Sequence, residues 1–175
     1  MRFFVLYAVL LVLGACAQLE TRVPQDVQFD LSGRLAARYR DEAFSGNIAW
    51  RHAASADEML ITSALGAGIA RIVRDGNNVT LTTAEPREYR AADAEALTEE
   101  VLGFRVPLAG LADWVQGKPS AASPASADHA PDGRLRSLQQ QGWNVEYLEY
   151  QGSRPSRLRL TYPGIELRLA ISEWK

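Results

Sequence analysis

The sequence has few of the residues that build disulfides, metal sites and catalytic centres. Cys16 is the only cysteine among 175 residues, which excludes a disulfide within the chain. The two histidines, His52 and His129, lie far apart and match no metal-ligand spacing. We expect His52 at the end of a strand and His129 in a loop, both solvated. No nucleophile elbow or phosphate-binding loop occurs, so the sequence gives no reason to propose an enzyme, a cofactor or a metal.

Long apolar runs are also scarce, and the one prominent run lies at the N-terminus. Residues 3–13 are wholly apolar and follow a single charge, Arg2. The run is too short for a membrane-spanning helix, which needs about 20 residues, but it suits the apolar region of a signal peptide. It leads into Leu-Gly-Ala-Cys at residues 13–16, in which small residues precede the cysteine whose thiol takes a diacylglycerol in bacterial lipoproteins. The alternative is an ordinary signal peptide, or a short anchor helix, with an incidental cysteine.

The chain is therefore predicted to have three parts. Residues 1–15 form a lipoprotein signal peptide, and residues 16–28 form the lipid-attachment cysteine and a polar tether. Residues 29–175 form one domain, which is long enough to bury its own core. The net charge of −2 gives no basis for a nucleic-acid partner.

Most of the domain alternates between apolar and polar residues, as half-buried strands do. Asp75-Gly76-Asn77-Asn78 predicts a hairpin turn, because glycine and asparagine tolerate positive φ. Counting the weaker patterns, we expect about ten strands. The clearest segments cover residues 29–39, 44–50, 59–63, 69–74, 79–83, 135–140, 143–147, 158–162 and 165–171.

Two amphipathic helices interrupt these strands. Asp93 is a candidate N-cap for a helix over about 93–102, and Pro107 can open a second helix over about 108–116. Residues 120–132 are rich in alanine, serine and proline and predict a mobile surface loop. Consecutive hairpins favour an antiparallel sheet that curls towards a barrel. We therefore expect a mainly β fold with helices (α+β), in which helices cover the open side of an unclosed antiparallel barrel.

A set of short motifs stands in a fixed order along the chain. The motifs are Phe29-Asp30-Leu31-Ser32-Gly33-Arg34-Leu35-Ala36, Phe44-Ser45-Gly46 with Trp50, Leu65-Gly66, Leu102-Gly103, Val106-Pro107-Leu108, Leu111, Trp114 through Gly117 to Pro119, Gly142-Trp143, Tyr147, Tyr150 and Trp174. This ordered set, behind Cys16, resembles the LolB family of outer-membrane lipoprotein receptors. The resemblance runs from Cys16 to Trp174. It departs from the family at Ala64, where the family usually has proline, and residues 120–132 match nothing in the family pattern.

The resemblance implies an apolar cavity under a helical lid, and a task that is not enzymatic. The family accepts mature lipoproteins from a periplasmic, LolA-like carrier, binds their acyl chains and inserts them into the outer membrane. It implies a lipid-anchored protein on the periplasmic side of that membrane, acting as a monomer on acylated lipoprotein cargo and outer-membrane lipid. The alternatives are a structural or assembly lipoprotein with a packed core, or a lipoprotein that binds a small apolar ligand.

Three sets of residues are candidates for this task. Cys16 is the lipidation site, and Leu65 with Gly66 forms a projecting membrane-insertion loop; the alternative for Leu65 is burial in the core. Arg34 and Arg38 belong to the solvated face, where contact with an acidic carrier is an alternative. A third set are candidates for the acyl-chain cavity, and the alternative for each of them is ordinary core, because periodicity does not distinguish a filled barrel from a hollow one. These candidates are Phe29, Leu31, Leu35, Phe44, Ile48, Trp50, Trp114, Trp143, Val145, Leu158 and Leu160.

Overall fold

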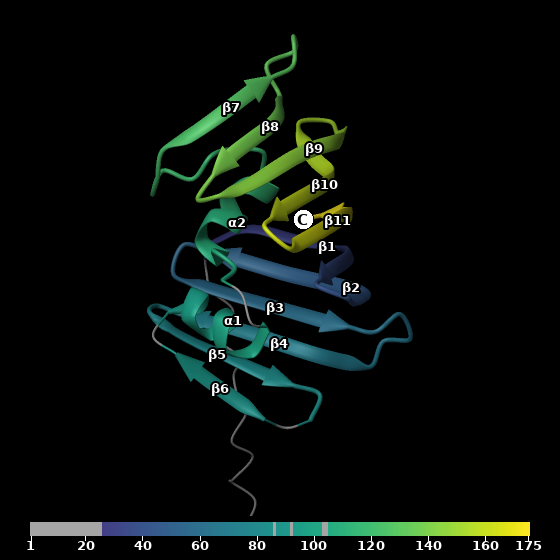
Figure 1. The fold of residues 1–175 in the computed structure, drawn as a ribbon, viewed down its shortest axis with the longest axis vertical. Coiled ribbons are helices and arrows are strands. Elements are labelled where there is room, and N and C mark those ends of the chain that lie inside the picture. Colours follow the sequence, from purple (N-terminus) through teal and green to yellow (C-terminus); the bar gives the residue numbers. More distant parts are fainter. Residues whose placement is uncertain (1–25, 86, 92, 103–104) are drawn as a thin grey trace, which may run out of the picture.

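A computed structural model describes residues 26–85, 87–91, 93–102 and 105–175, and it places all strands in one antiparallel sheet (Figure 1). The predicted signal peptide, Cys16 and most of the tether lie outside the described residues. The strands are β1 (Val27–Tyr39), β2 (Glu42–Ala53), β3 (Ala56–Thr62), β4 (Gly68–Asp75), β5 (Asn78–Thr83), β6 (Glu88–Ala91), β7 (Ala125–His129), β8 (Leu135–Gln140), β9 (Trp143–Gln151), β10 (Arg154–Tyr162) and β11 (Ile165–Trp174).

The order of the strands explains how one sheet forms from two runs of hairpins. The order is β6-β5-β4-β3-β2-β1-β11-β10-β9-β8-β7, so the first and last strands pair in the middle, with Leu35 opposite Leu169. Strands β6 and β7 are the two edges of an open sheet. The mainly β, antiparallel prediction is confirmed.

Two strands differ from the sequence prediction. β6 was not expected, and β7 lies inside the stretch 120–132 that was predicted to be a loop. All five residues of β7 are exposed, and they pair with β8 from Ala125 opposite Gln140 to His129 opposite Leu135. The loop prediction is wrong at β7 because backbone pairing with a neighbour can hold a strand that has no apolar face of its own.

Two helices lie on the same face of the sheet (Figure 1). Helix α1 (Ala94–Leu102) packs over β5 and β6, and the carboxylate of Asp93 accepts the backbone N–H of Glu95 at 3.0 Å, which confirms the predicted cap. Helix α2 (Leu108–Val115) follows Pro107 and buries Trp114 and Val115. No helix in the described part of the chain is long and apolar enough to cross a membrane.

The core is continuous but uneven across the sheet. Strands β8 to β10 and helix α2 bury large side chains completely, among them Leu138, Val145 and Leu158 at 0% exposure. On β1 and β3 several inward-facing side chains, including Leu35 and Ile61, are only half-buried. The space beside these residues is the candidate site.

Candidate functional site: an apolar pocket beside a projecting loop

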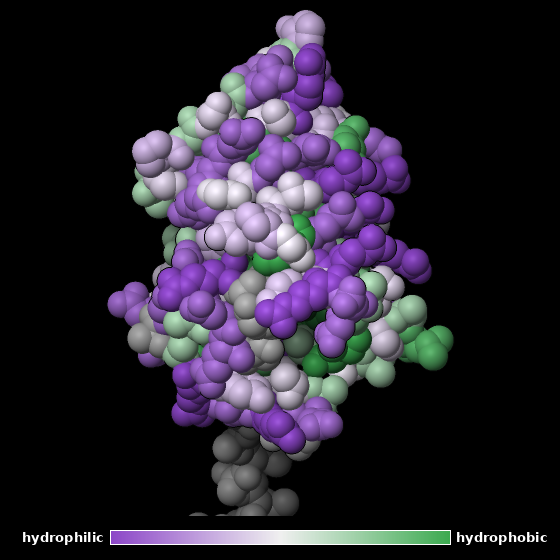
Figure 2. Space-filling view, viewed as in Figure 1, coloured by the Kyte–Doolittle hydropathy of each residue, from purple (hydrophilic) through white to green (hydrophobic). Residues whose placement is uncertain are grey.

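An apolar pocket of about 400 Å³ lies between the inner face of the sheet, chiefly β1 to β4, and the segment that carries α1 and α2. The sheet supplies aliphatic and aromatic side chains, and the helical segment supplies Thr98, Val106, Leu108 and Leu111 from the other side. Figure 2 shows apolar surface in a hollow over the middle strands. The remaining lining residues are Leu35, Ala37, Tyr39, Glu42, Ala43, Phe44, Ile48, Trp50, Met59, Ile61, Ile69, Ala70, Ile72, Leu160, Leu167 and Leu169.

The pocket divides the predicted cavity residues into two groups. Leu35, Phe44, Ile48, Trp50 and Leu160 line it. The other six belong to the packed core away from this pocket, and all are nearly inaccessible because large neighbours fill the space around them; they are Phe29, Leu31, Trp114, Trp143, Val145 and Leu158.

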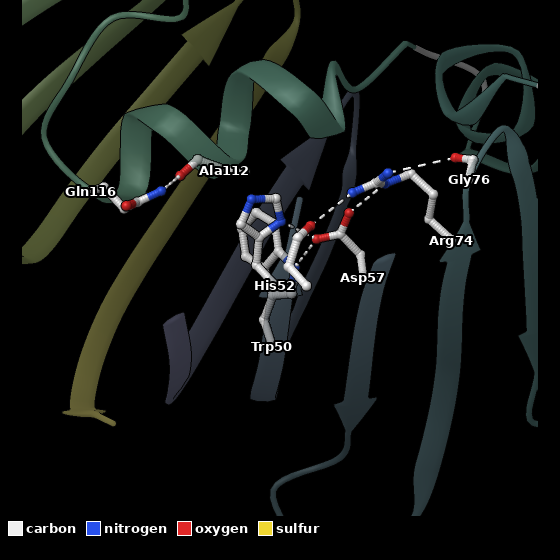
Figure 3. Close-up of polar contacts among 8 residues, drawn as sticks. Trp50, His52, Asp57, Arg74, Gly76, Ala112 and Gln116 are labelled. Carbon is white, nitrogen blue, oxygen red and sulfur yellow. Dashed lines mark hydrogen bonds and ion pairs between the residues drawn. The ribbon is translucent and has the colours of Figure 1, made fainter. Parts of the chain in front are cut away.

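A buried polar cluster lies behind the pocket wall at Trp50 (Figure 3). The carboxylate of Asp57 accepts hydrogen bonds from Trp50 Nε1 at 2.9 Å and His52 Nδ1 at 2.6 Å, and it pairs with Arg74. Burial of Asp57 raises its pKa, but hydrogen bonds from His52, Trp50 and Arg74 outweigh burial, so the pKa is lowered overall. The cluster fixes Trp50 and joins β2, β3 and β4.

The prediction that both histidines are solvated is wrong for His52. Only 12% of its side chain is exposed, and its ring stacks on Phe29 at a centroid distance of 4.9 Å. The carboxylate of Asp57 makes this burial possible because it satisfies a ring nitrogen. His129 is exposed as expected, but in β7 rather than in a loop. Among the described residues, no group of acidic, histidine or cysteine side chains could hold a metal ion.

The loop between β3 and β4 carries Leu65 into solvent. Leu65 is 98% exposed, whereas no other large apolar residue in the described part of the chain is more than 44% exposed. Gly66 has a φ of +87°, a conformation that favours glycine, and its N–H donates to the carbonyl of Ser63 at 2.9 Å. The N–H of Ser63 donates to the carbonyl of Ala67 at 2.8 Å, so the turn is internally bonded. Leu65 therefore lies in solvent, as the prediction of a projecting loop required, and the alternative of burial in the core is excluded.

The base of the loop is held against β2. The amide of Asn47 donates to the carbonyl of Ser63 at 3.0 Å. A Cβ at Gly46 would lie 2.2 Å from the carbonyl oxygen of Thr62, so only glycine allows this close approach. The loop thus projects from a fixed base, and Figures 1 and 2 show it as an apolar projection at the side of the sheet.

The loop and the pocket share the same two strands. Ile61 on β3 and Ile69 on β4 both line the pocket, and each is four residues from Leu65. An exposed leucine at the tip and an apolar pocket beside its base form one continuous structural unit. Such an arrangement can shelter an apolar ligand and also present an apolar contact outside the protein.

Comparison with known proteins identifies the family. The family model described as outer membrane lipoprotein LolB matches residues 27–174. The outer-membrane lipoprotein LolB of Thiobacillus denitrificans is 37% identical, covering 99% of this chain and 97% of that protein. That of Nitrosomonas europaea is also 37% identical, covering 95% and 89%. A LolA superfamily protein of Nitrosomonas europaea, a solved structure, aligns at 13% identity with a TM-score of 0.49 over 88% of this chain and 87% of that one. From the family model and the sequence relatives, the chain is a member of the outer-membrane lipoprotein LolB family.

Proposed function

We propose that this protein accepts mature lipoproteins from a periplasmic carrier, shelters their acyl chains in the apolar pocket and inserts them into the outer membrane. The observation that carries the proposal is the placement of a fully exposed leucine on the same two strands that line the pocket. Membership of the LolB family supports the same role. Cargo, carrier and outer-membrane lipid are the partners of this activity.

The physical need for such a pocket follows from the cargo. A triacylated cysteine carries on the order of 40 methylenes, each of which costs about 0.8 kcal/mol to expose to water. The total of roughly 30 kcal/mol prevents free diffusion of the cargo through water. Transfer without a nucleotide must lower the free energy at each step. The receptor therefore needs to bury the acyl chains only slightly better than the carrier does, and the bilayer only slightly better than the receptor.

The helical segment acts as a lid in this proposal. Its residues Val106, Leu108 and Leu111 form one side of the pocket and the sheet forms the other. The volume of about 400 Å³ lies near the lower end of the range for ligand pockets. Cargo with three chains therefore requires the helices to move away from β1 to β4, and their return would expel the chains.

Lipid attachment at Cys16 would hold the receptor on the periplasmic face of the outer membrane. The apolar run at residues 3–13 and the small residues before the cysteine support cleavage by a lipoprotein signal peptidase. Mass spectrometry of the protein from membranes should find an N-terminus at Cys16 with added acyl mass. An unmodified chain that begins at another residue would contradict this anchor.

The test of the proposed function is Leu65→Glu in two separate assays. Contact of the leucine with the bilayer contributes roughly 1.5–3 kcal/mol, and a glutamate loses that gain and adds a charge that must be desolvated. A difference of about 3 kcal/mol is more than a hundredfold in population, so release of cargo to liposomes should stall. Uptake of cargo from the carrier should be unchanged, because Leu65 lies outside the pocket.

A matched control is Asn77→Glu, which adds the same charge in the exposed β4–β5 turn. This variant should take up and release cargo like the unmodified protein. Normal release by Leu65→Glu would contradict the insertion role, and failure of the unmodified protein to take up acylated cargo would contradict the receptor role.

A further inference from the structure

A second pocket, of about 350 Å³, lies on the opposite face of the sheet from the apolar pocket. Arg34, Arg157 and Arg168 line it, together with the small residues Ala36 and Ala170. Alternation along β1 places Arg34 and Ala36 opposite in direction to Leu35 and Ala37, which face the apolar pocket. The second pocket therefore opens on the other face of the sheet from the site proposed for acyl chains, and Leu35 and Leu169 contribute to the walls of both.

The strand register explains why the arginines surround a hollow. One row across the sheet runs from Arg34 on β1 through Ala170 on β11 to Arg157 on β10. The next row places Ala36 beside Arg168. Arginine and alanine thus alternate along and between β1 and β11, whereas on β10 Arg159 stands opposite Arg168. The methyl groups of Ala36 and Ala170 leave a floor between the three arginine side chains that line the pocket. The second pocket therefore has cationic side chains at its rim and small side chains at its floor.

The charges of this rim are only partly neutralised. Arg157 pairs with Glu149 at 2.6 Å and Arg168 with Glu166 at 2.8 Å. Arg34 is exposed, and it has no acidic partner among the residues that the structure describes. Guanidinium groups bind phosphate oxygens with two parallel hydrogen bonds. The rim therefore offers a net positive charge that a phosphate group can neutralise, beside apolar lining residues such as Leu148.

The pocket also adjoins the projecting loop. Ala64 is one of its lining residues, and the next residue is Leu65. Asn47, which also lines the pocket, donates to the carbonyl of Ser63 and so fixes the loop to this face. A loop whose tip enters the hydrocarbon must cross the headgroup layer, so its base comes to lie at the depth of the lipid phosphates.

We infer that this pocket binds the phosphate of an anionic phospholipid while the Leu65 loop is in the bilayer. The inference rests on the proposed function, because it requires the loop to engage a membrane. Arg34 would supply the unneutralised charge, and Arg157 and Arg168 would add hydrogen bonds. The receptor would then be oriented on the membrane by two contacts, one apolar and one ionic, in addition to its lipid anchor.

The test uses the full-length acylated protein reconstituted into phosphatidylcholine vesicles that contain a photoreactive phosphatidylglycerol. Labelled peptides identify where the headgroup lies. Labelling should concentrate on the segments around Arg34 and Arg157. Arg34→Gln should lower it about fivefold, the effect of one cationic residue at an anionic surface. Photoreactive phosphatidylcholine should label these segments weakly, and millimolar inorganic phosphate should compete poorly.

Arg38→Gln is the matched control, because Arg38 is an exposed arginine on the same strand and face but does not line this pocket. The Arg38→Gln protein should be labelled as strongly as the unmodified protein. Equal losses in both variants, or no loss in Arg34→Gln, would overturn the site. Slower uptake of cargo by Arg34→Gln in the absence of vesicles would assign the pocket to the acidic carrier instead. Failure of the proposed function would appear separately, as normal release by Leu65→Glu.

Discussion

The two halves of the sheet bury their inner faces to different extents. Strands β8 to β10 and helix α2 are closely packed, and Trp114 and Val145 are at most 1% exposed. Strands β1 to β4 carry half-buried side chains such as Leu35 and Ile61 around the apolar pocket. One half thus forms an ordinary core and the other surrounds the apolar pocket, although both arise from the same alternation of apolar residues.

Side-chain size accounts for this difference. In the packed half, Leu138 on β8 stands opposite Val145 on β9, and the indole rings of Trp114 and Trp143 lie against each other with their centroids 6.4 Å apart. In the open half, Ala37 and Ala70 occupy inward-facing positions on the pocket wall. A methyl group in place of a larger side chain leaves volume that the helices do not fill. The hollow is therefore encoded by small residues within otherwise regular strands.

The largest effect on stability is expected from Trp114→Ala in the packed half. Trp114 is 1% exposed and its Nε1 donates to the side-chain oxygen of Gln140 at 2.7 Å, so truncation creates a cavity and removes one of the hydrogen bonds of this buried amide. The free energy of unfolding should fall by about 3–5 kcal/mol. Chemical denaturation measures this loss. A loss below about 1 kcal/mol would show that this half is not the rigid part of the molecule.

A somewhat smaller effect is expected from Asp57→Asn, which removes the buried charge that holds β2, β3 and β4 together in the open half. Loss of charged hydrogen bonds to Trp50, His52 and Arg74 should lower the free energy of unfolding by about 3 kcal/mol at pH 7. The loss should not exceed that for Trp114→Ala, because asparagine keeps the side-chain volume and two of the partners, His52 and Arg74, are partly solvated.

The same substitution should also change the dependence of stability on pH. The pKa of Asp57 is lowered in the folded protein, so its contribution is present above the unfolded pKa of about 3.9 and is lost as the pH falls through the folded value. Denaturation at several pH values between 3 and 7 should therefore show a steeper acid loss in the unmodified protein than in Asp57→Asn. Parallel curves would contradict a lowered pKa.

Period-two alternation was sufficient to predict the sheet and most of its strands. The apolar residues of β9, Trp143, Val145 and Tyr147, are buried as their spacing predicts. β7 could not be predicted in this way, because a strand that is exposed on both faces leaves no periodic signal. The pairing of β1 with β11 also depends on the whole topology, since no local pattern relates residues so far apart in the chain.

The projecting loop was more predictable than the pocket. Leu65 followed by glycines indicated an exposed apolar tip, and the resemblance to the LolB family indicated its position. Pocket residues could not be separated from core residues such as Trp143, because both face inwards with the same period. The Asp57 cluster was missed, although Asp57 precedes Met59 by two residues and so shares its buried face. That position of a charge on an apolar face was the available signal.

The smallest effect on stability is expected where a large side chain is added to the open half, and this prediction separates the two halves most directly. Ala37→Trp places an indole in the apolar pocket, where there is room for it. The free energy of unfolding should change by less than about 1 kcal/mol, since no packed neighbour must move. The identical change Ala112→Trp falls on helix α2, where Ala112 is 2% exposed, and overpacking there should cost about 1–3 kcal/mol or more.

The two substitutions should affect ligand binding in the opposite order, with the larger effect at Ala37. An acyl-chain fluorophore should bind Ala37→Trp at least several-fold more weakly than the unmodified protein, because the indole occupies the space that the probe needs. It should bind Ala112→Trp, under conditions where that variant is folded, with nearly unchanged affinity. Equal destabilisation by both substitutions would mean that the pocket at Ala37 closes in solution. Unchanged binding by Ala37→Trp would place the acyl chains elsewhere on the protein.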